Sequence, residues 1–484
     1  MVIGNEPLNK EQMQKIHNAT LEVLEKIGLR VDCDKFWGPL KAAGAKVDES
    51  AHIIKFPSRI IENMLDYLKS QIKSGRRQYL LNGVTNPKWT PPLGYKFGGA
   101  CIEYLDYELD TVRSPTEQDL IKLLQLGEAL DSVGFVGNPV ACLIDKQANN
   151  VPGPLQRIKT AAIVAKYTTK CGSTEIWNAQ ELEFLMELGQ IVRDGENEYI
   201  QKPCFITAKE TIAPLQFPAD DGEILLLLAK KGLPCMIVPM PITGATCPCT
   251  PAANIVMANA EILGVFACLH KAAPQAMFGA GVITGTLDMS AGAASFSSPE
   301  ALLQDIGLAQ LYDNFYGQDL AIGTGYIDAK YPGAQSLSEK TMKMFSAGQI
   351  GRWNFPLGLL AGGKRFSPEQ ALLELEIAES IKKFFSGFEM DENTLAADVI
   401  MEVGIGGEFV SHEHTLNNFK KMWMPKLLDR RCPSTLENEK TNDMLAAAHN
   451  QLVSIWNRDD LYQIDDERAK AIDKVVASAE RILK

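Results

Sequence analysis

The sequence lacks several features that define common classes of protein. Its 484 residues include only six histidines, and none of its ten cysteines forms a Cys-x-x-Cys pair. The spacing gives no sign of a zinc ribbon or a disulfide framework, and the thiols are typical of reduced cysteines. No uninterrupted run of about 18 apolar residues occurs, so we expect no membrane-spanning helix. The N-terminus lacks the charged and apolar stretches of a signal peptide, so we predict a cytoplasmic location.

The chain also has fewer basic than acidic residues. The chain has 48 Lys and Arg against 60 Asp and Glu, a formal net charge of -12. A surface of this sign disfavours nucleic acids and anionic membranes, and we expect neither as a partner. Hydrophobic residues make up 46% of the chain, which is ordinary for a globular protein and enough for a large core.

The first 115 residues are predicted to form a small α+β cap. Apolar residues recur at helical spacing over residues 9–27, and Gly28 suits the end of that helix. A second helix is expected over residues 58–68. Residues 80–113 show no helical rhythm and contain glycine, proline and aromatic residues. Because no flexible linker follows, we expect this region, residues 1–115, to pack tightly on the rest.

From residue 116 the pattern changes to regular alternation of helices and short apolar strands. Such alternation implies parallel strands with helices outside, and more than six units favour a (β/α)8 TIM barrel. The sequence therefore predicts a barrel with C-terminal helices over residues 116–484, with its first strand near residue 130. The expected strands are 132–140, 170–176, 204–210, 234–241, 275–282 and 319–325, with two less distinct ones near 355–360 and 398–410.

One junction, residues 239–263, joins a loop rich in proline and threonine to an apolar helix. Thr250 is a natural N-cap, and Pro251 suits the first helical position because its missing N–H needs no partner there. Asn254 and Glu261 are seven residues apart and so share one helix face. This face either reaches the surface or satisfies a buried polar spot.

Polar residues follow several of the predicted strands, where barrel enzymes place their active sites. They are Lys209, Glu210, Asp328, Lys330, Gln335 and Glu339. His412 and His414 form a His-x-His pair, which is a weak metal signal without further ligands, and we expect no tightly bound metal. Lys209 or Lys330 would suit a Schiff-base lyase on a barrel, provided that its pKa were lowered by burial.

Several blocks of sequence resemble one known family. They read "PMPITGATCPCTPAANIVMANAEIL", "GTGYIDAKYPGAQSLSEK", "GGKRFSPEQALLELEIAESI", "FVSHEHTLNNFKKMWMPKLLDR" and, nearer the N-terminus, "YLDYELDTVRSPTEQDLIKL". These blocks are similar to the trimethylamine methyltransferase family, and the resemblance extends over roughly residues 8–475. It implies a TIM barrel that transfers a methyl group from a methylamine to the Co(I) corrinoid (cobalamin) of a partner protein.

One departure from the family narrows the expected substrate. The founding enzymes carry pyrrolysine in the barrel, whereas this chain has only ordinary residues; the region to compare is 325–335. The chain thus resembles the non-pyrrolysine branch, whose members demethylate glycine betaine, proline betaine or carnitine. We expect glycine betaine first, because it is the smallest. The expected partners are a cognate corrinoid protein, the quaternary amine and further copies of the chain in a homo-oligomer.

The chemistry of a quaternary ammonium suggests which residues form the site. Aromatic faces bind such a cation, and the candidates are Trp89, Tyr95, Phe97, Trp177, Tyr326, Tyr331 and Trp353. Each of these is also an ordinary core-packing residue. Lys330, Arg352 and His414 could meet a substrate carboxylate, and Gln335 is a further binding candidate. We predict His414, Asp328 and Glu210 as catalytic residues. A non-catalytic betaine-binding protein remains the alternative to an enzyme.

Overall fold

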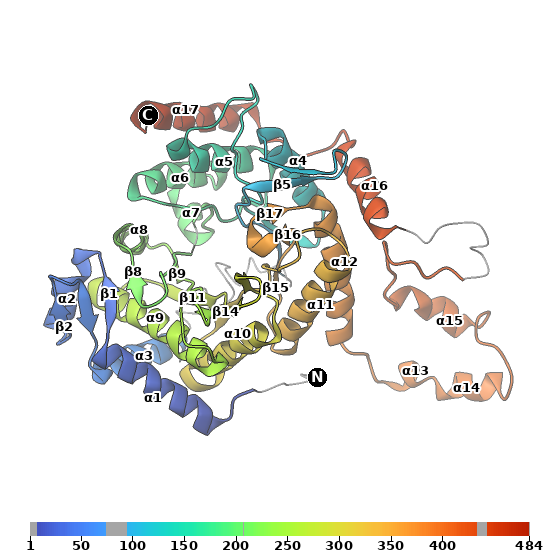
Figure 1. Ribbon diagram of the computed structural model, residues 1–484. Coiled ribbons are helices and arrows are strands. Elements are labelled where there is room, and N and C mark those ends of the chain that lie inside the picture. Colours follow the sequence, from blue (N-terminus) through green and yellow to red (C-terminus); the bar gives the residue numbers. More distant parts are fainter. Residues whose placement is uncertain (1–6, 74–93, 207, 433–442, 484) are drawn as a thin grey trace.

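The computed structural model describes residues 7–73, 94–206, 208–432 and 443–483. Short strands occupy its centre, and helices pack around them (Figure 1). The helices that follow the central strands are α4 (Glu117–Ala129), α5 (Gly153–Tyr167), α6 (Ala179–Val192), α7 (Glu196–Gln201), α8 (Ala219–Lys230), α9 (Pro251–Ala272), α10 (Pro299–Leu311), α11 (Ala334–Gln349) and α12 (Pro368–Phe385). This is the mixed α/β class that the alternation predicts.

The N-terminal region forms a layer against α9. Its elements are α1 (Lys10–Lys26), β1 (Leu29–Val31), α2 (Trp37–Ala42), β2 (Lys46–Asp48), β3 (Ile53–Lys55) and α3 (Ser58–Lys73), with a 3-10 turn at Asp34–Phe36. The strands form a sheet of order β2-β3-β1-β8, in which β1 pairs in parallel with β8 (Gln216–Phe217). Both α1 and α3 pack on α9. The N-terminal region is therefore joined to the rest by a shared sheet as well as by helix packing.

The central strands form two parallel ladders. One ladder is β15 (Asn354–Pro356), β4 (Gly94–Phe97) and β7 (Val133–Val136), and another is β9 (Cys235–Ile237), β11 (Phe278–Val282) and β14 (Leu320–Ile322). Two segments lie between the ladders. Cys171 bridges to Val136 of β7, and Lys209 bridges to Ile237 of β9. Between β14 and β15, Thr324 Oγ1 donates to Asn354 O at 2.5 Å.

Two details of this order differ from the sequence prediction. The parallel strands begin at β4, not near residue 130, so strand pairing crosses the predicted boundary at residue 115. The sequence did not predict β4, because Lys96 interrupts the apolar pattern of this strand. The predicted strand near residues 398–410 is wrong, because Ala397–Val403 forms helix α14. The predicted strand near 355–360 is confirmed in part by β15.

Two small sheets lie at the ends of the central strands. One has the order β16-β17-β5-β6 and comprises β5 (Glu103–Asp106), β6 (Thr111–Arg113), β16 (Leu359–Leu360) and β17 (Arg365–Phe366), with a 3-10 turn at Ala361–Gly363. The other has the order β10-β12-β13 and comprises β10 (Ile242–Thr243), β12 (Gly285–Asp288) and β13 (Ala293–Ser295). These sheets extend the loops that follow the central strands.

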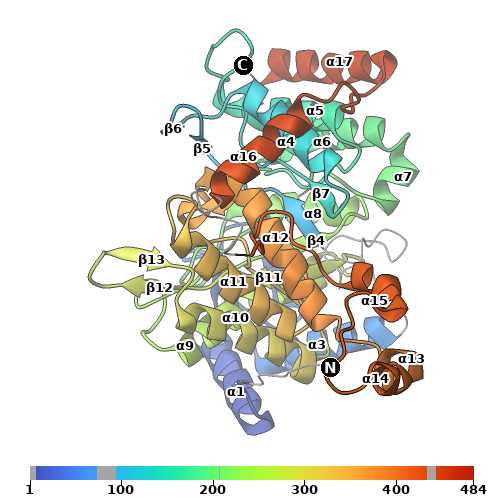
Figure 2. The same ribbon diagram turned by 90° about the vertical axis from the view of Figure 1, so that its right-hand side faces the viewer.

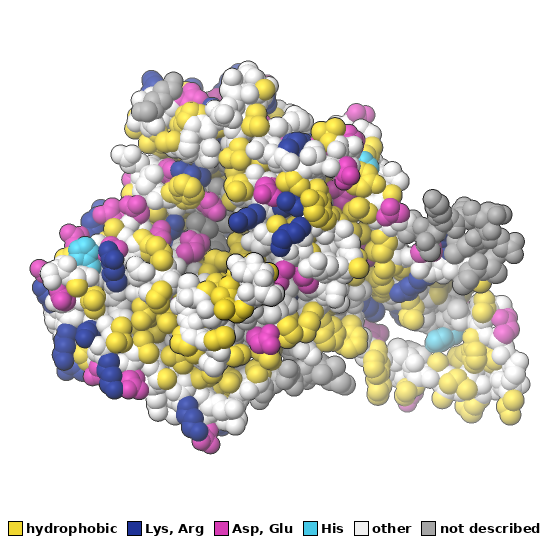
Figure 3. Space-filling view, in the orientation of Figure 1, with side chains coloured by type: hydrophobic (Ala, Val, Ile, Leu, Met, Phe, Trp, Pro, Cys, Tyr) yellow, Lys and Arg dark blue, Asp and Glu magenta, His cyan; other side chains and the backbone are white. Residues whose placement is uncertain are grey.

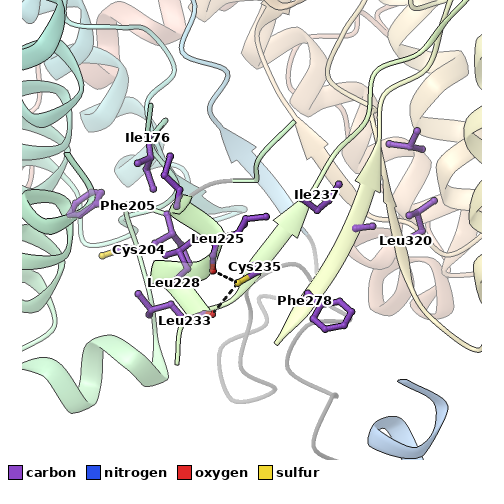
Figure 4. Packing of buried hydrophobic residues seen from close by; sticks show 14 of the residues in the cluster. Ile176, Cys204, Phe205, Leu225, Leu228, Leu233, Cys235, Ile237, Phe278 and Leu320 are labelled. Atoms are coloured by element: carbon purple, nitrogen blue, oxygen red, sulfur yellow. Dashed lines mark hydrogen bonds between the residues drawn. The ribbon is translucent and has the colours of Figure 1, made fainter. Parts of the chain in front are cut away.

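The main core lies between the central strands and the helices. Figure 4 shows Cys235, Ile237, Phe278 and Leu320 packed with side chains that include Leu225 and Leu228 of α8. The Cys235 thiol donates to the carbonyl of Leu225 at 3.3 Å, and burial raises its pKa to about 12. This thiol is therefore a neutral packing group and not a nucleophile.

The polar residues of α9 satisfy buried groups and do not reach the surface. Thr250 caps the helix by accepting from Ala253 N, as predicted. The Asn254 amide donates to Pro241 O at 2.9 Å and to Thr243 Oγ1 at 3.0 Å. Glu261 accepts from Thr211 Oγ1 at 2.5 Å and from Leu215 N at 2.8 Å. The asparagine and the glutamate thus fix two separate loops against the helix.

Helix α9 is also long and apolar enough to cross a membrane by length and composition. Within the fold, however, 78% of that window is buried inside the protein. Its buried residues contact the N-terminal layer on one side and α10 on another. It is therefore the central core helix of this fold.

The C-terminal part first leaves the body and then returns to it. Helices α13 (Glu392–Leu395), α14 (Ala397–Val403) and α15 (Glu413–Asn418), with a 3-10 turn at Phe419–Lys421, stand away from the rest in Figure 1 and lie toward the viewer in Figure 2. Helix α16 (Met444–Trp456) then packs on α4 and α12, and α17 (Asp466–Ile482) packs on α5 and α6. We call residues 387–424 the arm.

A fully buried ion pair joins α11 to α12. Lys340 Nζ lies 3.2 Å from Glu374 Oε2, and both side chains are completely buried. The amine also donates to Gly325 O at 2.7 Å and to Pro356 O at 3.1 Å. Glu374 accepts from Gly358 N and Gln370 Nε2. The pair therefore holds the loops after β14 and β15 against the two helices.

Lys340→Met is expected to lower the free energy of unfolding by about 3 to 5 kcal/mol, because it leaves Glu374 charged and buried without a cation. The double variant Lys340→Met/Glu374→Leu should lose less than the sum of the single variants. Urea unfolding followed by circular dichroism measures both. Additive losses would contradict the proposed coupling.

Candidate active site

Two carboxylates and a tyrosine follow central strands at the same ends of those strands. Glu175 follows the Cys171 segment, Glu210 follows Lys209, and Tyr326 follows β14. Burial raises the pKa of Tyr326 to about 12, with further contributions from Cys101, Glu210 and Glu175. The three groups are therefore near enough to act on one another electrostatically. We call Glu175, Glu210 and Tyr326 the Glu–Tyr cluster.

Glu210 has the environment of a residue inside a hollow. Its side chain is exposed to solvent. Even so, the surrounding protein raises the pKa of its carboxyl to about 7 by desolvation, while Lys209 opposes the rise and Asp221 and Glu175 add to it. Solvent access together with dense surroundings is typical of a concave surface. Figure 3 shows acidic and basic side chains gathered near the centre of this face.

A second aromatic ring supports Tyr326. The rings of Phe296 and Tyr326 lie 5.6 Å apart at 79°, an edge-to-face arrangement. Gly363, at a φ of +86°, lies against the Tyr326 ring, and a Cβ there would stand 2.4 Å from it. Any larger residue at 363 would displace the ring. This close approach therefore fixes where the aromatic face lies.

A buried lysine holds both aromatic residues in place. Lys343 Nζ donates to Phe296 O and to Tyr326 O, each at 2.6 Å. Burial lowers the pKa of Lys343 and raises that of its electrostatic partner Asp305. Asp305 accepts from the backbone and hydroxyl of Thr284. Lys343 is therefore a positioning residue for the two rings.

Asp328, which the sequence placed in the site, joins two loops. Asp328 accepts from Phe296 N at 2.7 Å and from the Ser295 hydroxyl. Glu339 accepts from Asp328 N at 2.8 Å and from Gln335 Nε2 at 2.7 Å. Asp328 therefore positions Phe296. Gln335 contacts Glu339, which in turn contacts the backbone of Asp328. Their predicted catalytic and binding roles stay predictions.

The remaining candidates on this loop are exposed. Lys330 lies at the surface and donates to the carbonyl of Asp328. Tyr331 is 57% exposed, and the Arg365 guanidinium lies 4.9 Å from its ring centre. Arg365 also pairs with Glu103 at 2.8 Å. Lys330 is thus the accessible cation of this loop.

Trp177 lies beside Glu175, but one of its faces is already covered. Its indole N–H donates to Glu175 Oε2 at 3.2 Å, and the side chain is 61% exposed. The Arg157 guanidinium lies 4.0 Å from its ring centre and forms an ion pair with Glu181. Trp177 therefore borders the Glu–Tyr cluster and leaves only its other face for a ligand.

Several predicted binding residues lie elsewhere. Arg352 and Trp353 precede β15, at the opposite ends of the strands from the cluster. Arg352 pairs with Asp313 at 2.6 Å and Asp319 at 2.7 Å, and Trp353 packs on Phe385. Phe97 is fully buried against Phe366. These three side chains make contacts within the fold, and their predicted binding roles stay predictions. Tyr95 is likewise a buried core residue, and Trp89 lies outside the described residues.

His412 and His414 lie on the arm. His412 caps α15, accepting from His414 N at 3.0 Å, and its other nitrogen lies 3.6 Å from Glu402. Within one chain, the structure does not bring His414 to the loop that contains Asp328, because α15 stands apart from the body (Figure 1). Among the described residues, no group of three or more His, Cys, Asp or Glu could hold a metal ion.

The sequence prediction missed Glu175, Phe296 and Lys96. Lys96 lies on β4 between two fully buried residues, Tyr95 and Phe97, and so faces the other side of the strand. Its side-chain amine has no hydrogen-bond or ion-pair partner among the described residues, and burial lowers the pKa of this amine to about 8. The sequence signal for Lys96 was a charged residue between two apolar residues, Tyr95 and Phe97. Glu175 could have been found as the acidic residue that follows "KCGST".

Comparisons with known proteins place the chain among methyltransferases. The sequence profile of a family described as trimethylamine methyltransferase matches residues 3–482. The trimethylamine methyltransferase MttB of Desulfitobacterium hafniense is 26% identical over 446 residues, covering 92% of this chain and 88% of the relative. The glycine betaine methyltransferase of the same species is 26% identical over 445 residues, covering 90% and 88%.

Among solved structures, the monomethylamine methyltransferase MtmB of Methanosarcina barkeri superposes with a TM-score of 0.47 at 12% identity. The superposition covers 98% of this chain and 88% of that one.

Lys96→Met is expected to raise the free energy of unfolding at pH 7, because the folded protein buries an unpartnered amine. The fall in pKa from 10.5 to about 8 corresponds to at most about 3 kcal/mol, and partial solvent access reduces this. Between these pKa values the unfolded state binds more protons, so the parent gains stability as pH rises. The variant should lose that gain.

Urea unfolding at several pH values between 7 and 10.5 measures this effect. The exposed Lys474→Met is the matched control and should leave the pH dependence unchanged. A loss of stability in Lys96→Met at every pH would contradict the prediction and point to a missing partner for the amine.

Proposed function

The chain belongs to the trimethylamine methyltransferase family, and we propose that it moves a methyl group from a quaternary amine to the Co(I) corrinoid of a partner protein. The observation that carries the proposal is the Glu–Tyr cluster. Two carboxylates and an aromatic face at the ends of the strands suit a cation that has no N–H to donate. Glycine betaine is the first expected substrate, and proline betaine and carnitine share the same cationic group.

The proposed reaction needs little acid–base chemistry. The bond between nitrogen and the methyl carbon breaks, its electron pair stays on nitrogen, and the product is a neutral tertiary amine. The corrinoid of the partner would supply the nucleophile that takes the methyl group. The protein's own residues would orient the ammonium, with Tyr326 and Phe296 against it and Glu175 and Glu210 balancing its charge.

The carboxylates of Glu175 and Glu210 favour substrate binding but do not favour the methyl transfer itself. Their attraction is strongest while nitrogen is fully charged, and it weakens as the positive charge leaves nitrogen. They therefore stabilise bound substrate more than the transition state. The raised pKa of Glu210 moderates this, because its carboxyl is only partly ionised near neutral pH.

The other end of a betaine is a carboxylate that needs a donor. Of the predicted cations, Lys330 is on the loop that also carries Tyr326, and its amine is exposed. The guanidinium of Arg352 already forms ion pairs with Asp313 and Asp319. We therefore favour Lys330 for this contact.

We further infer that the central strands close into a (β/α)8 barrel. The order β15, β4, β7, the Cys171 segment, the Lys209 segment, β9, β11 and β14 supports this, because it runs through eight parallel segments. The hydrogen bond from Thr324 to Asn354 would lie at the closing seam. The cluster would then lie at the carboxyl-end mouth, where barrel enzymes bind substrates.

A Schiff-base enzyme is the second candidate, and one observation favours it. Lys96 has the lowered pKa that such chemistry requires, whereas Lys209 is held by Asp221 at 2.8 Å and by Ile176 O at 2.7 Å. Borohydride reduction with a panel of small aldehydes and ketones, followed by mass spectrometry, would attach a carbonyl compound to Lys96 in that case.

The protein should form methylcobalamin from cob(I)alamin and a quaternary amine but not from trimethylamine. The reason is that a quaternary ammonium leaves as a neutral amine, whereas a tertiary amine needs activation first. The assay follows the absorbance of methylcobalamin with glycine betaine, proline betaine, carnitine and trimethylamine in turn. Turnover of trimethylamine alone would refute the proposal, and binding of an amine without turnover would favour a binding protein.

Glu210→Gln should raise KM for the quaternary amine by about tenfold, roughly the effect of losing one charge contact, while kcat changes less. In the parent, KM should fall as pH rises through about 7, because Glu210 ionises there. The variant should lose this dependence. Steady-state kinetics between pH 6 and pH 8 separates the two parameters.

Glu467→Gln, an exposed acidic residue at the start of α17, is the control with the same change of charge. It should keep the KM and the pH profile of the parent. If Glu210→Gln also keeps both, then Glu210 does not face the cation.

A further inference from the structure

The arm concentrates uncovered apolar side chains. Of the twenty-five large hydrophobic side chains that are exposed among the described residues, twelve lie in residues 387–424. They are Phe388, Met390, Leu395, Ile400, Met401, Ile405, Phe409, Val410, Leu416, Phe419, Met422 and Met424. Monomeric proteins rarely expose so many together, so this surface is an interaction site.

The arm cannot hold its shape by itself. Helices α13, α14 and α15 have four, seven and six residues, and none of them has a buried residue. Isolated helices shorter than about 12 residues are marginal in water, and ordering a chain costs about 1 to 2 kcal/mol per residue. The arm has local hydrogen bonds, such as the one from Thr415 Oγ1 to Phe409 O, but no core to offset this cost. Its helices therefore need another surface.

The base of the arm, in contrast, is firmly attached. Glu376 of α12 accepts from Lys426 N at 2.8 Å and from Leu427 N at 3.1 Å, and Leu427 is buried. The arm is thus held at the body by its C-terminal end while its helices project outward (Figure 1). This arrangement suits a segment that reaches onto a neighbouring molecule.

We propose that the arm packs on a second copy of this chain, so that two copies exchange arms. A methyl-accepting partner must leave after each turnover, which would uncover twelve apolar side chains every time. A permanent interface avoids this, and permanent interfaces are the more apolar class. In a two-fold arrangement each copy supplies both an arm and the surface that receives the other arm.

The body offers a receiving surface next to the base of the arm. Phe384 of α12 is 56% exposed, and Met342 of α11 is 49% exposed. Phe384 packs on Phe345 with ring centres 5.5 Å apart, and Met342 lies one turn before Phe345. These residues form a continuous apolar strip, which we call the α11–α12 strip.

Charge favours the same pairing. The arm carries Glu389, Asp391, Glu392, Asp398, Glu402, Glu408 and Glu413 against Lys420 and Lys421. Lys382 and Lys383, in the last turn of α12, directly precede Phe384 of the α11–α12 strip. An acidic arm on a basic strip is attractive, and it favours the exchanged arrangement over arm-to-arm contact, in which like charges would meet.

The test measures molar mass by light scattering for the full chain and its variants. The parent should be a dimer or a larger even-numbered assembly at micromolar concentration. Met401→Asp/Val410→Asp should raise the dissociation constant by at least about tenfold, because both side chains lose their apolar cover. Lys382→Glu/Lys383→Glu should also weaken association, and adding Glu402→Lys/Glu408→Lys should restore it.

Ile27→Asp/Met289→Asp is the control, because these exposed apolar residues lie on the body. It should keep the mass of the parent. A monomeric parent, or an arm variant with unchanged mass, would overturn the proposal. An unchanged mass together with loss of methyl transfer to a corrinoid protein would assign the arm to that partner instead.

If an arm variant fails to fold, hydrogen exchange of the parent still decides the question. Amides of α13–α15 should be protected in the assembly and lose that protection on dilution, while those of α9 stay protected. Protection that does not change with concentration would show that the arm is stable within a single chain.

Discussion

Two buried lysines on one face of α11 organise the end of the fold where the candidate site lies. Lys340 and Lys343 are three residues apart and therefore point the same way. Their amines donate to the carbonyls of Gly325, Pro356, Phe296 and Tyr326. An ammonium group taken out of water must find such partners, so these loops have little freedom to move.

The consequence is a site with a fixed aromatic side and an accessible acidic side. Phe296 and Tyr326 are held by Lys343 and by the close approach of Gly363. Glu210 keeps its contact with solvent, although its surroundings raise its pKa. A ligand entering from solvent therefore meets the carboxylates of a preformed cluster, and little ordering energy is spent on the rings.

The sequence predicted the structure best at positions where a residue type favours one particular structural role. Thr250 and Pro251 predicted the start of α9, and the alternation of helices and strands predicted the mixed α/β class. It failed where three-dimensional context decides. Lys96 disguised β4, because a lysine inside a fold looks like a surface lysine in sequence. Residues 398–410 were predicted as a strand because they are rich in apolar residues. In the structure these side chains cover no core within one chain, and part of the segment is helix α14.

The site prediction shows the same division. Glu210 and Tyr326 were predicted because they directly follow strands, and both belong to the Glu–Tyr cluster. Arg352 and Trp353 were chosen by residue type alone, and they lie at the opposite ends of the strands. Glu175 and Phe296 were missed because their importance comes from neighbours more than a hundred residues away or on another loop, which no local pattern encodes.

The place of β4 between β7 and β15 has a consequence for how the protein is made. One neighbour, β7, follows soon after β4 on the chain, but β15 begins at Asn354. At synthesis rates of 5 to 20 residues per second, β4 waits roughly 10 to 50 s on the ribosome before its second edge can pair. Throughout that interval the half-built sheet presents one unpaired edge, and the charge of Lys96 on β4 disfavours the pairing of that edge with another chain.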